Sequence, residues 1–229
     1  RKVPKVRVLA GTGSNSTHEA IELSRNASKA GADGLLQITP YYNKPNQEGL
    51  YQHFSSIAEN VDLPIILYNV PSRTSVNLVP ETVVRLSKIK NIVGIKEASG
   101  SLQAISKIIN NCEDDFTVLS GDDPLLFPIL SIGGKGVISV TANILPHSVA
   151  MLCSYVEKNE FENARSQHYR LMDINEALFI DTNPVPVKAA LHLMGKIENE
   201  LREPLVELSN DHLETLKKAM AYHDLLVTK

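Results

Sequence analysis

The chain has 229 residues, of which 43% are hydrophobic and 21% charged, and its formal net charge is −3. This composition is typical of a globular protein with one large domain or a domain with an appendage, and it gives no indication of nucleic acid or an anionic membrane as a partner. The two cysteines, Cys112 and Cys153, form no CxxC pair, and no apolar run is long enough to span a bilayer. We therefore expect free thiols in a cytoplasmic protein.

Short apolar runs alternate with helical patterns over the first part of the chain. Runs of this kind between breakers are typical of parallel strands buried on both faces, and helices between them predict crossover connections. Ser16 and Glu19 have the spacing of a capping box at the start of one helix, and Pro80 suits the first position of another. The six predicted strands are residues 6–10, 34–39, 64–69, 92–96, 116–120 and 136–140.

After Leu145 the strand pattern stops and only helical patterns follow. We interpret the first of these helices as the last crossover helix and the rest as a helical appendage. This predicts a partial barrel over residues 1–158 and a helical region over residues 159–229. The predicted helices are 148–158, 161–179, 185–194 and 211–226.

Two α/β architectures compete for the strand-containing part. A doubly wound open sheet can hold six strands, whereas a TIM (β/α)8 barrel has eight. Polar side chains follow nearly every predicted strand, and in a barrel all of these strand ends meet at one mouth, which favours the barrel. These residues are Thr12, Tyr42, Tyr68, Arg73, Lys96, Asp122 and Asn143.

Lys96 stands at the end of the fourth predicted strand. Desolvation disfavours an ammonium group, and a free amine can attack a carbonyl carbon and form a Schiff base. The alternative is a structural lysine that reaches solvent or pairs with Glu97. The segment alone leaves both interpretations open.

Tyr68 ends the apolar run of the third predicted strand, and Arg73 lies in the loop that follows that strand. A phenol can relay protons beside an amine nucleophile, and a guanidinium group can bind a carboxylate with two parallel hydrogen bonds. The alternatives are a core tyrosine and a surface arginine. Asp122 and Asp123 fit a helix N-terminus better than a metal site or a carboxylate pair.

Metal and phosphate chemistry are both disfavoured by the sequence. The seven histidines show no HxH or HExxH spacing, which argues against a metal-dependent aldolase. The glycine-rich segment 133–136 precedes its strand, so it would lie at the edge of the sheet opposite the strand ends that carry chemistry. An amine, a phenol and an arginine indicate Schiff-base carbon–carbon bond chemistry on a 2-oxo acid, with no cofactor beyond the lysine imine.

Residues 68–73, YNVPSR, and residues 94–98, GIKEA, resemble the signatures of the dihydrodipicolinate synthase family. That family belongs to the pyruvate-dependent Schiff-base aldolases, together with N-acetylneuraminate lyase. The resemblance covers essentially the whole chain. It implies a homotetrameric barrel that condenses pyruvate with aspartate semialdehyde in lysine and diaminopimelate biosynthesis. Further matching segments are residues 39–43, 120–123, 136–140 and 183–188.

The resemblance also implies roles for individual residues. Lys96 would form the imine with pyruvate, Tyr68 would be the central proton relay, and Tyr42 would complete the relay of a neighbouring subunit. Arg73 would hold the carboxylate of aspartate semialdehyde, and it favours the synthase over the sialic-acid lyase. The pyruvate pocket would be lined by Gly121 and Ile138.

The family also has an allosteric lysine site at a dimer interface. Asn15, Glu19 and Tyr41 match lysine-contacting positions of the feedback-inhibited type, so lysine is an expected inhibitor. The polar pair Asn15 and Glu19 suits an ammonium ligand.

The six predicted strands match the third to eighth strands of the family barrel. The first two strands, and a threonine loop that links the two catalytic tyrosines, have no counterpart. We expect the sequence to be a piece of a longer protein, because a natural six-stranded version would expose two sheet edges. Two other functions stay open: a retro-aldol lyase acting on a sugar acid, and a catalytically inactive lysine-binding subunit.

Overall fold

The computed structural model describes residues 6–226, which divide into two compact units. The sheet unit runs to Asp122 and also contains Ser131–Ile138. The helical unit contains Asp123–Leu130 and the residues from Ser139 onward. The boundary expected between residues 158 and 159 falls inside the helical unit.

The sheet unit has six parallel strands whose order in space is their order in the sequence. The order never reverses among the described residues, so these strands lack the switch point of a doubly wound sheet. The α/β class and the succession of six parallel strands were predicted correctly. The strands are β1 (Leu9–Gly11), β2 (Gly34–Ile38), β3 (Ile65–Asn69), β4 (Ile92–Glu97), β5 (Thr117–Ser120) and β6 (Gly136–Val137).

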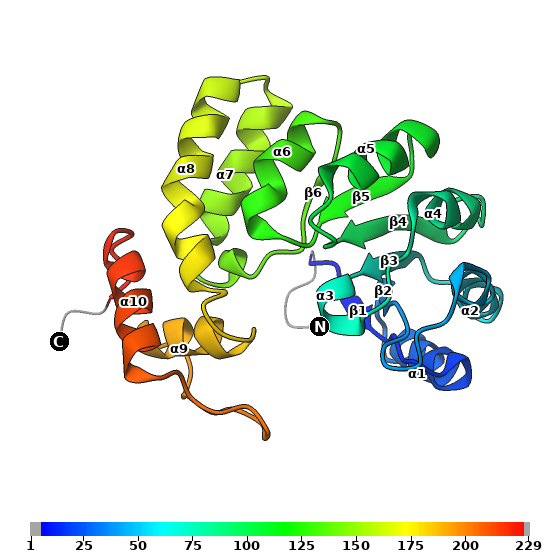
Figure 1. Ribbon diagram of the computed structural model, residues 1–229, viewed down its shortest axis with the longest axis horizontal. Helices are drawn as coiled ribbons and strands as arrows, with labels where there is room; N and C mark the ends of the chain where they lie inside the picture. Colours follow the sequence, from blue (N-terminus) through cyan, green and yellow to red (C-terminus); the bar gives the residue numbers. More distant parts are fainter. Residues whose placement is uncertain (1–5, 227–229) are drawn as a thin grey trace. The chain divides into compact units, whose positions relative to one another are not determined.

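Four helices of the sheet unit follow one another along the outer side of the strands (Figure 1). A doubly wound sheet carries helices on both faces, whereas a row of helices along one side is typical of a barrel wall. Within this unit, the arrangement is therefore of the barrel type. The helices are α1 (Thr17–Lys29), α2 (Gln47–Glu59), α4 (Pro80–Leu86) and α5 (Leu102–Asn111).

Burial alternates along β3 and β5, and along β2 after Gly34. Leu35, Leu67 and Ile95 face the helices and are fully buried, while Leu36 and Ile66 on the other face are only half-buried. The expectation of strands buried on both faces was therefore wrong for β2 and β3. The reason is that α1, α2, α4 and α5 all cover the same side.

One short helix of the sheet unit was not predicted. α3 (Pro71–Thr74) is a single turn in the segment expected to be a loop. Pro71 begins it, as the fixed φ of proline allows, and Ser75 ends it with a φ of 59°. This turn carries Arg73.

The last strand, β6, is shorter than the predicted segment 136–140. Val140 and Thr141 donate their backbone N–H groups to the Asp123 carboxylate, at 2.8 and 3.2 Å, so these donors do not extend a strand ladder. Asp123 thus begins the short 3₁₀ turn η1 (Asp123–Leu125) and holds a second one, η2 (Thr141–Asn143).

The helical unit packs its helices in pairs: α7 contacts α8, α8 contacts α10, and α10 contacts α9. No helix among the described residues combines the length and apolar character needed to cross a membrane. The helices are α6 (Leu126–Ser131, whose last residue belongs to the sheet unit), α7 (Pro146–Glu157), α8 (Phe161–Ala177), α9 (Val185–Leu193) and α10 (Asn210–Ala221).

Candidate active site

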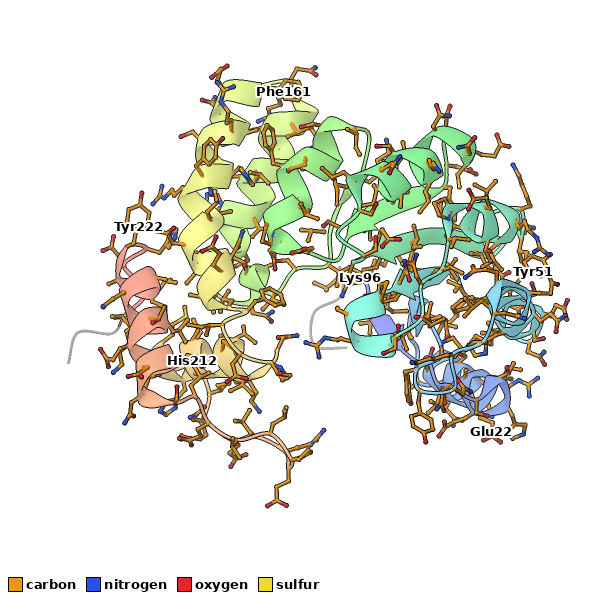
Figure 2. All side chains as sticks on the ribbon, in the orientation of Figure 1. Glu22, Tyr51, Lys96, Phe161, His212 and Tyr222 are labelled. Carbon is orange, nitrogen blue, oxygen red and sulfur yellow. The ribbon has the colours of Figure 1, made fainter. Side chains whose placement is uncertain are left out.

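Lys96 and Tyr68 face each other across neighbouring strands. Lys96, labelled in Figure 2, stands near the end of β4, and its register partner on β3 is Tyr68. The Lys96 Nζ atom lies 4.0 Å from the centroid of the Tyr68 ring. Both side chains are half-buried. An amine and a phenol are thus held together at the carboxyl ends of adjacent parallel strands, the edge where barrel enzymes place their chemistry.

Gly121 leaves room for the lysine side chain. A Cβ atom at this position would lie 2.9 Å from Lys96 Cε and 2.7 Å from Ala98 Cβ, both shorter than normal contacts. The Gly121 N–H donates to the carbonyl oxygen of Glu97 at 2.8 Å, which brings its backbone against β4. Only glycine permits this close approach without a shift of the amine.

The electrostatic surroundings of Tyr68 are set by burial and by Arg73. Burial raises the pKa of the Tyr68 phenol, and the positive charge of Arg73 acts in the opposite direction. Arg73 itself is exposed on the single turn α3. The structure therefore brings together Lys96, Tyr68 and Gly121, with Arg73 close enough for its charge to act on the phenol.

Ile138 follows β6 directly. Its backbone N–H donates to the Ser120 carbonyl oxygen at 2.9 Å, and its side chain is half-buried. Ile138 therefore lies at the same strand-end edge of the sheet unit as Gly121.

Tyr42 does not join Lys96 and Tyr68 within this chain, because its side chain is 89% exposed. Its φ of 72° lies in the left-handed region, which is uncommon for a bulky residue and is often found at functional sites. The neighbouring Tyr41 is also exposed.

The residues expected to bind lysine lie around the start of α1. Asn15 Nδ2 donates to the Tyr41 carbonyl oxygen at 3.2 Å, and Glu19 accepts a hydrogen bond from Ser14 Oγ. Ser16 caps α1 as predicted, accepting from the Glu19 N–H at 3.4 Å. The Ser16 N–H donates to Ser14 Oγ at 3.1 Å rather than to Glu19, so the predicted capping box is only half formed.

Glu97 is a buried acid whose role the sequence reasoning missed. Successive strand residues point to opposite faces, so its carboxylate lies on the face away from Tyr68. Glu97 is 1% exposed, and burial raises its pKa, opposed by hydrogen bonds from Asn69 and Ser99. It had been considered only as a partner of Lys96, although strand alternation was the signal against that interpretation.

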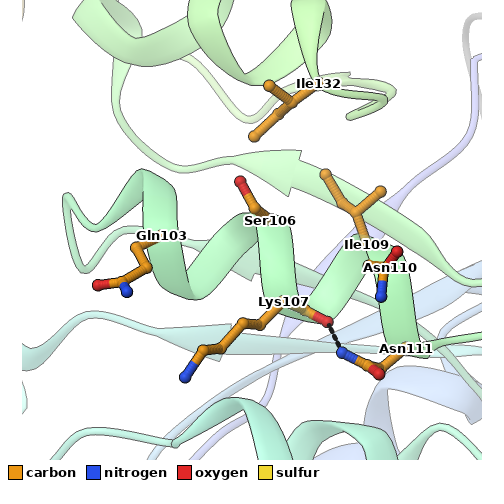
Figure 3. A pocket seen from close by; sticks show the side chains of 7 residues that line it. All are labelled: Gln103, Ser106, Lys107, Ile109, Asn110, Asn111 and Ile132. Carbon is orange, nitrogen blue, oxygen red and sulfur yellow. Dashed lines mark hydrogen bonds between the residues drawn. The ribbon is translucent and has the colours of Figure 1, made fainter.

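A surface pocket lies away from these strand ends, on α5 and the segment before β6 (Figure 3). Its volume is about 530 Å³, and it contains none of the predicted catalytic residues. Among the described residues, no group of three or more His, Cys, Asp or Glu side chains could hold a metal ion. The pocket is lined by Gln103, Ser106, Lys107, Ile109, Asn110, Asn111 and Ile132.

Comparison with known proteins gives one consistent family. The profile of the dihydrodipicolinate synthetase family matches residues 3–223. A 4-hydroxy-tetrahydrodipicolinate synthase of Syntrophus aciditrophicus is 54% identical over 222 residues, which are 97% of this chain and 76% of that protein.

Solved structures agree with this result. A monomeric dihydrodipicolinate synthase variant superposes with a TM-score of 0.96 at 46% identity, over 97% of this chain and 76% of that one. The Cyanidioschyzon merolae enzyme, solved with lysine bound, gives a TM-score of 0.94 at 44% identity, over 96% of this chain and 75% of that one.

Proposed function

Since this chain belongs to the dihydrodipicolinate synthetase family, we propose that it is a 4-hydroxy-tetrahydrodipicolinate synthase, which condenses pyruvate with aspartate semialdehyde. The assignment of the site rests on one observation: the Lys96 Nζ atom lies 4.0 Å from the centroid of the Tyr68 ring, at the ends of neighbouring strands. No cofactor beyond the lysine imine enters the proposal.

In the proposed reaction, the free amine of Lys96 adds to C2 of pyruvate and water leaves, which forms an imine. Loss of a proton from C3 gives an enamine, whose carbon attacks the aldehyde carbon of aspartate semialdehyde, and the resulting alkoxide takes up a proton. The amine of the acceptor then attacks the imine carbon, closes the ring and releases Lys96.

Tyr68 is the proposed proton relay. A tyrosine phenol carries its proton at neutral pH, and burial raises the pKa of Tyr68 further, so the neutral phenol can donate to an oxygen that becomes charged. Arg73 is the proposed binding group for the acceptor carboxylate, since a guanidinium group can form two parallel hydrogen bonds with it. Gly121 and Ile138 are proposed to border the pyruvate site.

We further propose that the six strands correspond to strands three to eight of a (β/α)8 barrel. Their sequential parallel order and the helices along one side support this. Homotetramer formation, with Tyr42 reaching a neighbouring subunit, is supported by the exposure and the left-handed backbone of this tyrosine. Lysine inhibition through Asn15, Glu19 and Tyr41 is supported by the contact between Asn15 and the Tyr41 backbone.

The deciding experiment is borohydride reduction in the presence of pyruvate, followed by mass spectrometry of the intact chain and its peptides. We expect one reduced pyruvate adduct, located on the peptide that contains Lys96. Lys96→Ala should abolish the adduct. Lys88→Ala, which removes a surface lysine paired with Glu113, should leave it unchanged.

An unmodified wild-type chain from a folded preparation would refute the Schiff-base proposal and leave the inactive lysine-binding subunit. An adduct together with cleavage of a sugar acid, and no condensation with aspartate semialdehyde, would favour the lyase instead.

A further inference from the structure

We propose that Glu97 is a positioning residue: through Asn69 it holds the segment that carries Arg73, and so sets the affinity for the second, carboxylate-bearing substrate. This inference rests on the proposed function, because it takes Arg73 as the group that binds that carboxylate.

The first observation is the complete burial of the Glu97 side chain. Burying a carboxyl group is costly unless its oxygens accept hydrogen bonds. Here Asn69 Nδ2 donates to both oxygens, at 3.2 and 3.0 Å, and the Ser99 N–H donates to Oε1 at 2.7 Å. Glu97 therefore joins the outer faces of two neighbouring strands.

The second observation is the position of this pair directly behind the reactive one. Asn69 and Glu97 are register partners on β3 and β4, one step beyond the partners Tyr68 and Lys96. Because successive strand residues point to opposite faces, Asn69 and Glu97 face the helices, whereas Tyr68 and Lys96 face the opposite side. The backbone also joins the strand ends, since the Ala98 N–H donates to the Asn69 carbonyl oxygen at 2.9 Å.

The third observation links Asn69 to the Arg73 segment. Asn69 Oδ1 accepts from the Leu78 N–H at 3.0 Å, and Asn69 Nδ2 donates to Asn77 Oδ1 at 2.8 Å. The segment from residue 70 to residue 78 is thereby closed at its base by one side-chain amide. Glu97 fixes the orientation of that amide by accepting from its nitrogen.

Backbone pairing already holds Lys96 and Tyr68, since both lie within the ladder between β3 and β4. Loss of the Glu97 contact should therefore affect Arg73 more than the amine. Gln47 of α2 gives the segment a second anchor, because its Nε2 donates to the Asn77 carbonyl oxygen at 2.7 Å and its Oε1 accepts from the Val79 N–H at 3.2 Å. The expected effect is thus partial rather than complete.

The test compares the KM values of the two substrates in Glu97→Gln, which keeps the shape but replaces one accepting oxygen with a donor. We expect the KM for aspartate semialdehyde to rise about tenfold, with the KM for pyruvate within about twofold of wild type and borohydride trapping intact. Asn77→Ala, at an exposed residue, removes the hydrogen bond from Asn69 Nδ2 to Asn77 Oδ1 and should also raise the KM for aspartate semialdehyde. If Glu97→Gln does not fold, the comparison of the two KM values is made in Asn77→Ala instead.

Asn91→Ala is the matched control, because Asn91 Nδ2 donates to the Ala58 and Val61 carbonyl oxygens, at 3.0 and 2.8 Å, just before β4 begins. It should lower stability without changing the ratio of the two KM values. An equal rise of both KM values in Glu97→Gln, no rise at all, or the same rise in Asn91→Ala would overturn the inference. Absence of a pyruvate adduct on wild-type Lys96 would instead refute the proposed function.

Discussion

At the scale of single residues, Gly121 is the position where the smallest change should affect the chemistry most. In Gly121→Ala the added Cβ atom would lie within 2.9 Å of Lys96 Cε. Gly121 is not among the positive-φ residues, so the strain would come from this contact and not from the backbone. We expect the rate of pyruvate trapping to fall tenfold or more, and the free energy of unfolding to decrease by about 1–3 kcal/mol.

The control for this prediction is Gly11→Ala at the end of β1, where an added Cβ atom meets no heavy atom within 4 Å. It should leave both trapping and stability close to wild type. Normal trapping kinetics in Gly121→Ala would show that the lysine side chain can move aside at little cost, and the close approach would then have no catalytic importance.

The residues of the candidate site were predictable to different degrees, and their positions explain why. Lys96 and Tyr68 end apolar strands, so the sequence itself pointed to them. The contact of Glu97 with Asn69 depends on the register between β3 and β4, which no pattern within one strand contains. The space left by Gly121 likewise depends on how β5 approaches β4.

At the scale of helices and strands, the contact between α1 and α2 contains a histidine that makes stability depend on pH. His53 is 5% exposed, and its Nδ1 atom is hydrogen-bonded to Thr17 Oγ1 at 2.9 Å. Burial lowers the pKa of His53 to about 4 from a usual 6.5. The unfolded chain therefore binds this proton more readily than the folded one.

The sign of the effect follows from this difference. Above about pH 6.5 the histidine is neutral in both the folded and the unfolded chain, so it does not lower the free energy of unfolding. As the pH falls from about 6.5 towards 4, only the unfolded chain takes up the proton, and the free energy of unfolding decreases by up to roughly 3 kcal/mol. Urea unfolding across this range should show a steeper loss for wild type than for His53→Gln, which cannot take up the proton. Parallel pH profiles for the two proteins would rule out His53 as the source.

The elements that sequence analysis placed well are those whose pattern extends over several residues. The apolar runs of β2 to β5 were found within a residue or so of their ends. The single turn α3 is too short to show helical periodicity, so Pro71 was read as part of a loop. The early end of β6 results from the contact of Asp123 with Val140 and Thr141, which are distant in the sequence.

At the scale of the whole molecule, burial is the property that local patterns predict least well. Leu36 and Ile66 were expected to be fully buried, yet they lie on the half-buried face of the sheet unit. Periodicity shows which residues share a face, but not what covers it. The same holds for Tyr42, whose exposure in one chain fits the proposal that it acts in a neighbouring one.

This proposal predicts that two inactive variants restore each other. Lys96→Ala lacks the nucleophile, and Tyr42→Phe should lose about a hundredfold in turnover if the phenol belongs to the proton relay. In a mixed dimer, the site that keeps Lys96 receives Tyr42 from the other chain. Random reassociation should therefore restore about a quarter of the wild-type sites, measured as turnover after the two variants are co-expressed or refolded together.

Lys96→Ala mixed with Tyr68→Phe provides the negative control, because Tyr68 and Lys96 belong to one site of one chain. Neither site of that mixed dimer is complete, so turnover should stay at the level of the separate variants. If Tyr42→Phe also fails to complement Lys96→Ala, although the chains exchange, then Tyr42 acts within its own chain. Because the tyrosine is 89% exposed there, its loop would have to close over the site during turnover.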